Sequence, residues 1–212
     1  MSDAGNRPSG AEALVRLLES AGVEVIFGLC GDTSLPLYDA LARTGRGIRH
    51  VLTRDERSAG YMADVYARVS GKIGVCEGPS GGGATYLLPA VVEANESSIG
   101  LVALTTDVAT ASRGRYTLTE LDQEALFRPV TTWNRTIATS GELPRAVRRA
   151  FAEATTGRPG AVHLGVPMDV QKGPVTPDDL HIDPDHGRFP ARPATPPTAE
   201  VEAAAARLVA AA

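Results

Sequence analysis

The sequence has 212 residues, 43% of them hydrophobic, so the chain is long enough to bury a full core in one domain with additional segments. Its formal net charge is only -4 and it has no long basic run, which argues against a nucleic-acid partner. No segment has the ~18 uninterrupted apolar residues of a membrane helix, and the first residues lack the apolar core of a signal peptide, so we expect a cytoplasmic protein with no membrane partner.

Strand-like and helix-like apolar patterns alternate along most of the chain. We expect strands over residues 23–27, 48–52, 72–76, 101–104, 136–138 and 161–166, and helices over residues 11–20, 35–41, 54–70 and 142–155, with another helix after the glycine-rich turn at 78–83. This order predicts an α/β fold, a parallel sheet with helices on both faces. Ligands of such sheets bind beyond the carboxyl ends of the strands, so the turns after Phe27, Leu52 and Cys76 should meet at the site.

Two adjacent carboxylates, Asp55 and Glu56, stand at the start of the helix expected over residues 54–70. The unpaired amides and the dipole of a helix N-terminus favour negative charge, so from the residues alone both side chains are interpreted as capping groups. The same helix carries small residues on part of its surface: Ser58, Ala59, Gly60, Ala63 and Ala67. Since Gly60 costs a helix ~1 kcal/mol relative to alanine, we expect another backbone to pack closely there.

The third expected strand leads into a glycine-rich turn from Gly78 to Gly83. The amides of this turn are suited to face an anion or a cofactor ring, although glycines also serve a tight turn that has no ligand. The turn has neither the G-x-G-x-x-G pattern nor the Lys-Ser/Thr ending of a P-loop, so nucleotide binding is the weaker alternative. The polar stretch from Thr105 to Thr119 is expected to form a surface loop near this site.

The cysteines and histidines indicate no further site. Cys30 and Cys76 lack the spacing of a metal site or of a disulfide framework, and Cys76 is expected in the core. Cys30 follows a strand, but the sequence pairs no histidine with it, which argues against a nucleophile. The histidines are expected to be structural or to lie in a linker: His50, His163, His181 and His186.

Beyond the last expected strand the composition changes. Residues 171–197 are rich in proline and lack apolar periodicity, which predicts an extended linker. Residues 198–212 begin like a capped helix, and a helix of this length with nothing to pack on is marginal in water. We therefore expect a flexible N-terminus at 1–9, a folded α/β domain at 10–170, the linker, and then the first helix of a next domain that this sequence does not contain.

Five motifs follow one another between Gly10 and Val170: IFGLCGDTSLPLYDAL, RDERSAGYMADVYARVSGKIGVC, SGGGAT, ALFRPVT and TTGRPGAVHLGVPMDV. Each is weak alone, but their order and spacing together are specific. With them the sequence resembles the N-terminal pyrimidine-binding (PYR) domain of thiamin-diphosphate enzymes, nearest to the acetolactate synthase and pyruvate oxidase group. The resemblance implies the α/β fold of that domain, followed by a linker and a central domain.

In this family the glutamate at the position of Glu56 hydrogen-bonds N1′ of the cofactor's aminopyrimidine and favours the tautomer that activates the thiazolium. The resemblance thus implies thiamin diphosphate as cofactor, Glu56 as the catalytic residue, and a 2-oxo acid or related carbonyl as substrate, for carboligation or decarboxylation. It also implies that Gly31, Ser80, Gly81 and Gly83 lie along the pyrimidine together with Glu56.

The resemblance implies partners as well. Helix 56–70, which carries the small residues, would pack at the interface of a dimer of same-family subunits. The diphosphate and its Mg²⁺ are held in this family by a separate domain with a Gly-Asp-Gly motif and a following asparagine. Gly31-Asp32-Thr33 is not that motif, and the sequence offers no cluster of oxygen ligands for a cation. We therefore expect the chain to need the central and diphosphate-binding domains from elsewhere and not to turn over alone.

Several positions depart from the family pattern, in which a proline precedes the first glycine turn and TSGPGATN, FQE and a Gly-Gln pair occur later. The departing residues are Cys30, Pro79, Gly82, Tyr86, Thr106, Asp107, Leu118 and Thr119. They leave the substrate and the reaction subtype open. They also allow a second interpretation, a binding or assembly module of the same fold without catalysis.

Overall fold

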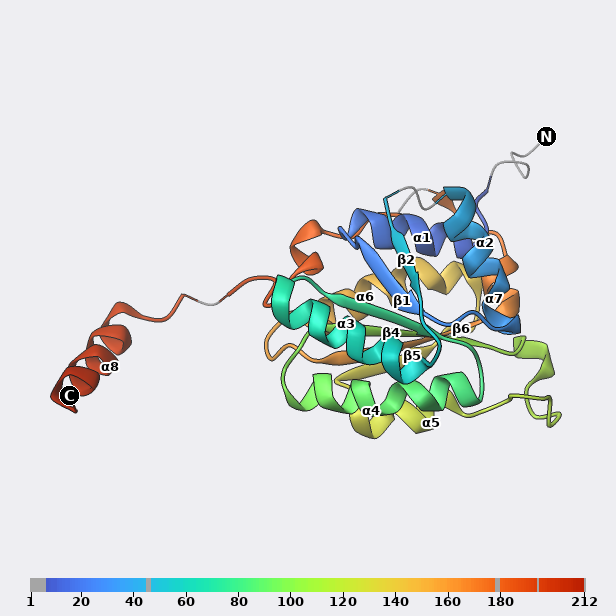
Figure 1. Ribbon diagram of the computed structural model, residues 1–212. Coiled ribbons are helices and arrows are strands. Elements are labelled where there is room, and N and C mark those ends of the chain that lie inside the picture. The colour runs from blue at the N-terminus through green and yellow to red at the C-terminus, as the bar shows by residue number, and fades with distance from the viewer. Residues whose placement is uncertain (1–6, 45–46, 178–179, 194, 212) are drawn as a thin grey trace.

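The computed structural model describes residues 7–44, 47–177, 180–193 and 195–211. A six-stranded parallel sheet runs through its centre in the order β2-β1-β3-β4-β6-β5 (Figure 1). The strands are β1 (Val25–Gly28), β2 (Arg49–Leu52), β3 (Gly74–Gly78), β4 (Leu101–Asp107), β5 (Trp133–Thr136) and β6 (Ala161–Pro167). The predicted α/β fold with a parallel sheet is confirmed.

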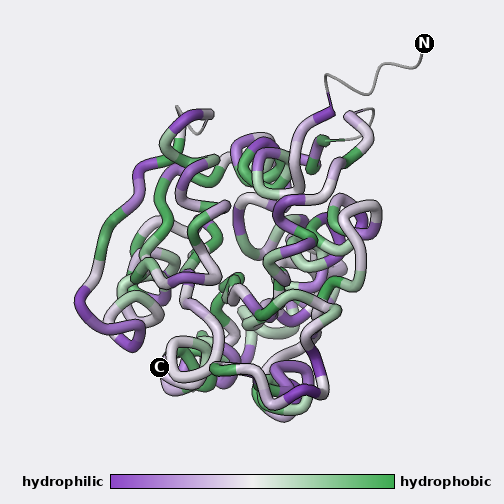
Figure 2. The backbone as a smooth tube through the Cα atoms, turned by 90° about the vertical axis from the view of Figure 1, so that its right-hand side faces the viewer, coloured by the Kyte–Doolittle hydropathy of each residue, from purple (hydrophilic) through white to green (hydrophobic). Residues whose placement is uncertain are grey.

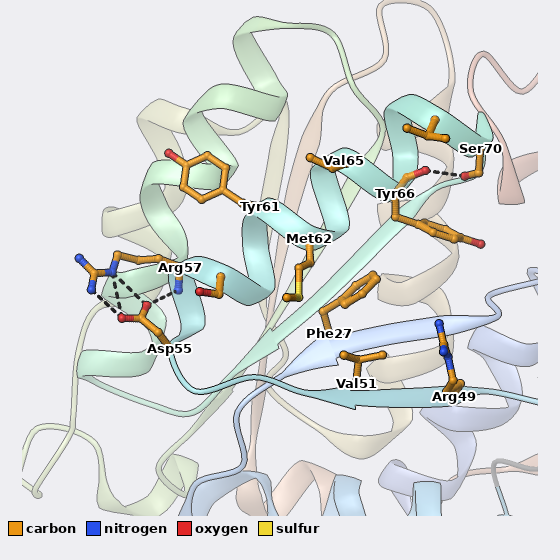
Figure 3. Close-up of a pocket in the computed structure, with 12 residues that line it drawn as sticks. Phe27, Arg49, Val51, Asp55, Arg57, Tyr61, Met62, Val65, Tyr66 and Ser70 are labelled. Atoms are coloured by element: carbon orange, nitrogen blue, oxygen red, sulfur yellow. Dashed lines mark hydrogen bonds and ion pairs between the residues drawn. The ribbon is translucent and has the colours of Figure 1, made fainter.

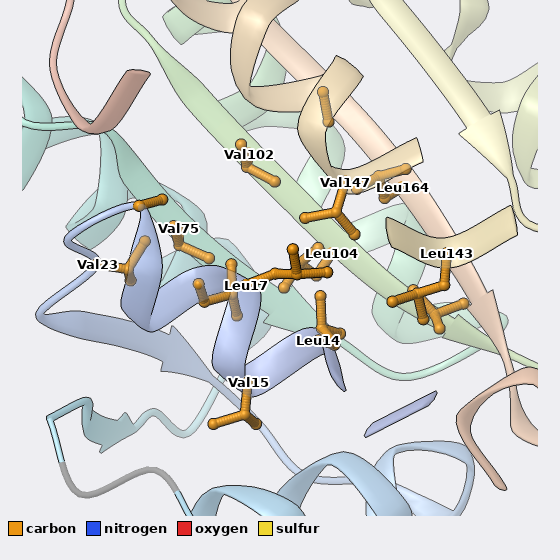
Figure 4. Packing of buried hydrophobic residues seen from close by; sticks show 14 of the residues in the cluster. Leu14, Val15, Leu17, Val23, Val75, Val102, Leu104, Leu143, Val147 and Leu164 are labelled. Atoms are coloured by element: carbon orange, nitrogen blue, oxygen red, sulfur yellow. The ribbon is translucent and has the colours of Figure 1, made fainter. Parts of the chain in front are cut away.

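One face of the sheet is covered by four helices: α1 (Gly10–Ser20), α2 (Leu35–Thr44), α6 (Leu143–Thr155) and α7 (Met168–Lys172). Leu14 and Leu17 of α1 and Val147 of α6 meet over β3, β4 and β6 in one buried apolar cluster (Figure 4). Helix α1 begins with a capping box, in which the Ser9 hydroxyl accepts from the Glu12 amide and the Glu12 carboxylate accepts from the Ser9 amide. The apolar face and the cap together fix where α1 starts.

The other face is covered by α3 (Glu56–Ser70), α4 (Gly82–Glu96) and α5 (Gln123–Phe127). A Cβ on Gly60 of α3 would lie 2.6 Å from Ala90 Cβ of α4, and a Cβ on Gly74 would lie 2.3 Å from the Ala63 carbonyl oxygen. The small residues of α3 therefore bring it close to α4 and β3 within the chain, which is the close packing expected at Gly60. Figure 2 shows hydrophobic stretches through the interior and hydrophilic stretches in the outer loops.

His163 of β6 is fully buried and stacks on Phe127 of α5, with the ring centroids 3.8 Å apart. Its Nε2 lies 2.6 Å from Thr105 Oγ1. Burial lowers the pKa of His163 to about 3, so the ring is neutral at physiological pH. These contacts agree with the structural role expected of His163, and Cys76 is buried in the core, as predicted.

Several elements differ from the prediction. Strand β4 continues to Asp107, so residues 105–107 are a buried strand end and not part of the expected surface loop, and helix α7 was not predicted. The edge strand covers Trp133–Thr136 and not residues 136–138, because Ile137, whose apolar side chain suggested the strand, is buried just beyond its end. Helix α5 was not predicted. It begins at Gln123, where the preceding Asp122 caps it with its carboxylate.

The segment expected as an extended linker packs on the domain over part of its length. Val175 and Ile182 are buried, and the Ala191 amide donates to the Thr155 carbonyl at 2.9 Å. Beyond it, α8 (Thr198–Ala210) is exposed along its described length and lies apart from the sheet (Figure 1). The proposed domain limits remain predictions. None of the helices in the described ranges has the length and apolar character needed to cross a membrane.

Candidate functional site

The turns that follow β1 and β3 touch at Pro79. A Cβ on Gly31 would lie 2.5 Å from Pro79 Cβ, and a Cβ on Gly83 would lie 2.5 Å from Pro79 Cδ. Both positions require glycine because the proline ring is packed between them. Since β1 pairs with both β2 and β3, the turn after β2 leads to the same edge of the sheet.

Glu56 is the first residue of α3 and is only 7% exposed. The residue before it, Asp55, is the N-cap: its carboxylate accepts from the Arg57 amide at 2.8 Å and pairs with the Arg57 guanidinium at 2.6 Å. Hydrogen bonds from Arg57 hold the pKa of Asp55 at about 2. Glu56 Oε1 lies 2.9 Å from the position that a Cβ on Gly83 would occupy. Asp55 therefore does the capping expected of both residues, and the Glu56 carboxyl faces the glycine turn. Its catalytic role stays a prediction.

Ser80 and Gly81 complete the turn. The Ser80 amide donates to Thr33 Oγ1 at 3.1 Å, and Thr33 Oγ1 donates to Ser80 Oγ at 3.2 Å. Gly81 has φ +68 and is the N-cap of α4, and a Cβ there would lie 2.9 Å from Thr119 Cβ. The left-handed backbone and the close approach of Thr119 both favour glycine. The five residues predicted to bind the cofactor thus lie at one edge of the sheet, although the Ser80 amide is already bonded within the protein.

One acidic residue of this edge was missed by sequence reasoning. The third strand was expected to end at Cys76, but β3 continues to Gly78 and includes Glu77, which is only 1% exposed. Ser34 Oγ donates to Glu77 Oε1 at 2.5 Å, and the Tyr38 hydroxyl donates to Oε2 at 2.7 Å. Burial raises the pKa of Glu77 to about 7. A carboxylate directly between a buried strand and a glycine turn is the signal that would have identified it.

Other positions that depart from the family pattern lie around this edge. Asp107, at the end of β4, is buried and pairs with the Arg113 guanidinium at 2.7 Å. Cys30 is exposed, and its thiol pKa is raised by partial burial and by the charge of Glu77. A raised pKa lowers the thiolate fraction, which agrees with the prediction that Cys30 is not a nucleophile.

A broad apolar groove of about 1190 Å³ runs along the exposed side of α3 (Figure 3). Exposed apolar residues of the helix line it together with residues of β1 and β2: Phe27, Val51, Tyr61, Met62, Val65 and Val69. Val65 is 55% exposed and Val69 is 84% exposed. A surface helix normally presents polar residues on its outer side, so this face of α3 is suited to a partner.

The sequence is similar to a known protein family and to individual known proteins. Residues 8–126 match the profile of the N-terminal TPP binding domain of thiamine pyrophosphate enzymes. The chain is 45% identical over 166 residues to a probable acetolactate synthase large subunit of Methanocaldococcus jannaschii, covering 78% of this chain and 28% of that protein. It is 41% identical over 170 residues to the acetolactate synthase large subunit of Corynebacterium glutamicum, covering 80% and 27%.

A relative with a different name is nearly as similar. The chain is 42% identical over 173 residues to a probable 2-ketoarginine decarboxylase of Pseudomonas aeruginosa, covering 80% of this chain and 31% of that protein. The chain therefore spans less than a third of the length of each of these relatives.

Proposed function

This chain belongs to the thiamine pyrophosphate enzymes, whose N-terminal TPP-binding domain it matches, and from that premise we propose that it supplies the pyrimidine half of a thiamin diphosphate site with Glu56 as the catalytic carboxyl. The observation that carries the proposal is the position of Glu56. It is buried, it is released from capping by Asp55, and its carboxyl faces Gly83.

The residues at this edge fit an aminopyrimidine. Such a ring presents nitrogen acceptors next to an amine donor, and a carboxyl beside the backbone of a glycine turn offers hydrogen-bonding groups of both kinds. Glu56 would hold a proton at the ring nitrogen that it faces, while the turn from Ser80 to Gly83 and Gly31 would set the plane of the ring. The bound cofactor supplies the carbanion chemistry.

The diphosphate half of the site is proposed to come from another unit. No cluster of three or more His, Cys, Asp or Glu that could hold a metal ion occurs in the described part of the chain. Mg²⁺ bound to phosphates needs several oxygen ligands. We infer that these ligands lie in a diphosphate-binding domain, and that the linker and α8 lead to the central domain.

We infer a 2-oxo acid as the substrate class of the complete enzyme. Relatives named as acetolactate synthases and as a probable 2-ketoarginine decarboxylase support this class. Because Tyr86 and Thr119 depart from the family sequence pattern, the reaction subtype has to be determined by experiment. A cytoplasmic location fits such an enzyme.

The test is cofactor binding and turnover in the holoprotein, meaning this chain together with the unit that holds the diphosphate. We expect saturable, Mg²⁺-dependent binding of thiamin diphosphate and consumption of at least one member of a panel of 2-oxo acids. Cofactor binding without consumption of any 2-oxo acid would overturn catalysis in favour of an assembly module. Absence of cofactor binding, with micromolar binding of NAD or ATP to the chain, would favour the nucleotide-binding alternative.

We propose that the apolar groove along α3 is covered by a second copy of the chain. A two-fold contact places the same helix face of both copies together, so the exposed residues Tyr61, Met62 and Val65 would cover one another. The proposed contact agrees with the expectation that helix 56–70 lies at the dimer interface, and it is made by the large apolar residues of the helix.

Val65→Asp is expected to make the chain monomeric. Because both copies carry the substitution, it puts two carboxylates into one apolar interface. Unpaired buried charges cost several kcal/mol, so the affinity of the dimer is expected to fall by about 100-fold or more. Val201→Asp on α8 is the matched control, because Val201 is 49% exposed and lies outside the groove. Sedimentation equilibrium measures both. A parent chain that is monomeric at all concentrations, or a Val65→Asp variant that still dimerises like the control, would contradict the proposal.

A further inference from the structure

Glu77 is the inner end of a line of hydrogen-bonded side chains. Ser34 Oγ donates to Glu77 Oε1 at 2.5 Å and lies 3.1 Å from Thr106 Oγ1 of β4. The second carboxylate oxygen of Glu77 accepts from the Tyr38 hydroxyl at 2.7 Å. Glu77, Ser34 and Thr106 are each at most 1% exposed, so this part of the line is shielded from solvent.

The line continues outward to the mouth of the site. Thr106 Oγ1 lies 2.8 Å from Thr33 Oγ1, which donates to Ser80 Oγ at 3.2 Å. Ser80 Oγ lies 2.7 Å from Thr119 Oγ1, and Thr119 is exposed. We call the set Ser34, Thr106, Thr33, Ser80 and Thr119 the hydroxyl line.

Thr119, at the outer end, is held in an unfavourable backbone conformation. Its φ is +69, which is strained for a β-branched residue. Its side chain packs against Gly81 and its hydroxyl lies within hydrogen-bonding distance of Ser80. The contacts of Thr119 with Ser80 and Gly81 connect the hydroxyl line to the glycine turn.

When Glu77 is protonated, every hydrogen bond of the hydroxyl line can be donated in the direction away from Glu77. A hydroxyl donates one proton and accepts others, so the carboxyl can donate to Ser34 and each hydroxyl to the next one out. The donation from Thr33 to Ser80 already has this direction. When Glu77 is ionised, Ser34 donates inward to it, as observed.

The surroundings of Glu77 allow both protonation states near neutral pH. The titratable groups around it are Tyr38 of α2, Cys30 of the turn after β1 and Glu56 of α3, and Cys76 is its neighbour along the strand. Burial is the main cause that raises its pKa, the two hydrogen bonds that it accepts lower it, and the charge of Glu56 raises it again.

We propose that Glu77 and the hydroxyl line form a proton relay, with Glu77 as the proton store and Thr119 as the outlet, which delivers a proton to a substrate oxyanion at the mouth of the site. In each delivery Glu77 gives one proton to Ser34, and each hydroxyl takes one proton from its inner neighbour and gives one to its outer neighbour. Thr119 gives one to the oxyanion, Glu77 is left as a carboxylate, and a proton from water returns along the same path. Only the destination of the proton rests on the proposed function.

The test follows the cofactor-free chain by NMR as the pH is varied. We expect the side-chain carboxyl carbon of Glu77 to titrate with a midpoint near 7 and the backbone amides of Ser80 and Thr119 to follow that midpoint. Glu77→Gln removes the transition from all of them. Thr106→Val removes a hydroxyl from the middle of the hydroxyl line. The Glu77 carboxyl is then expected to titrate as before, while the amides of Ser80 and Thr119 no longer respond at its midpoint. Thr33→Val makes the same cut and replaces Thr106→Val should that variant not fold.

Two controls separate the relay from other causes. Thr155→Val removes a buried hydroxyl outside the line and is expected to leave all three titrations unchanged. Glu56→Gln is expected to move the shared midpoint to lower pH, because the charge of Glu56 raises the pKa of Glu77, while the amides of Ser80 and Thr119 still follow it. The relay would be overturned if the amides of Ser80 and Thr119 did not titrate with the midpoint of Glu77 in the parent. It would also be overturned if they still did so in Thr106→Val or no longer did so in Glu56→Gln. Since no cofactor is present, such a result leaves the proposed function standing.

Discussion

Replacing Glu56 by glutamine is expected to lower kcat of the holoprotein by about 10²–10⁴-fold, the usual contribution of a positioned proton donor or acceptor. Glutamine keeps the size of the side chain and its place between α3 and Gly83, but it cannot deliver a proton to the ring nitrogen. Steady-state kinetics on the preferred 2-oxo acid measures the effect, and calorimetric titration with thiamin diphosphate checks that the cofactor still binds.

Asp55→Asn is the matched control for Glu56→Gln. Asp55 is the adjacent carboxylate at the same helix start, and asparagine is as good an N-cap as aspartate, so the helix is preserved. The control is expected to keep kcat within about threefold of the parent. If Glu56→Gln is as active as Asp55→Asn, the assignment of the two carboxylates is wrong.

Glu77→Gln is expected to stabilise the chain above pH 7 and to have little effect at pH 4.5. The folded pKa of Glu77 is about 7 against an ordinary value of 4.5, so the folded state binds the proton more tightly than the unfolded state. The stability due to this group is fully present below pH 4.5 and is lost as the pH rises to 7. The loss is about 3 kcal/mol, and the glutamine variant does not suffer it.

Urea unfolding at pH 4.5 and pH 8 measures this difference. Glu202→Gln, on the exposed helix α8, removes the same charge from a solvated position and is expected to change the free energy of unfolding by less than about 0.5 kcal/mol at either pH. A Glu77→Gln effect that is the same at both pH values would show that Glu77 keeps an ordinary pKa in the folded chain.

The sheet could be predicted because its central strands are buried on both faces. Such strands appear as short apolar runs separated by helical patterns, and Leu101 to Leu104 is one of them. The edge strand β5 has polar residues on its exposed side and so lacks an apolar run. The prediction therefore relied on Ile137, which lies just beyond the end of the strand. The linker prediction missed Val175 and Ile182 because isolated apolar residues have no periodicity, although each is buried against the domain.

The site was harder to predict than the fold. Asp55 and Glu56 fit a helix N-terminus equally well, so local rules do not separate the cap from the carboxyl that faces the turn. Their difference depends on Gly83, which is distant in sequence. Glu77 was overlooked because its partners are distant in sequence, Ser34 in the turn after β1 and Tyr38 on α2, and only the folded chain brings them to its carboxylate.

We propose that the Glu56 carboxyl acts on the pyrimidine of bound thiamin diphosphate. The most direct measurement is ¹⁵N NMR of N1′-labelled thiamin diphosphate bound to the holoprotein and to its Glu56→Gln variant. We predict that the N1′ resonance of the bound cofactor moves away from its free value in the parent and returns toward it in the variant. The same bound resonance in both proteins would contradict the account.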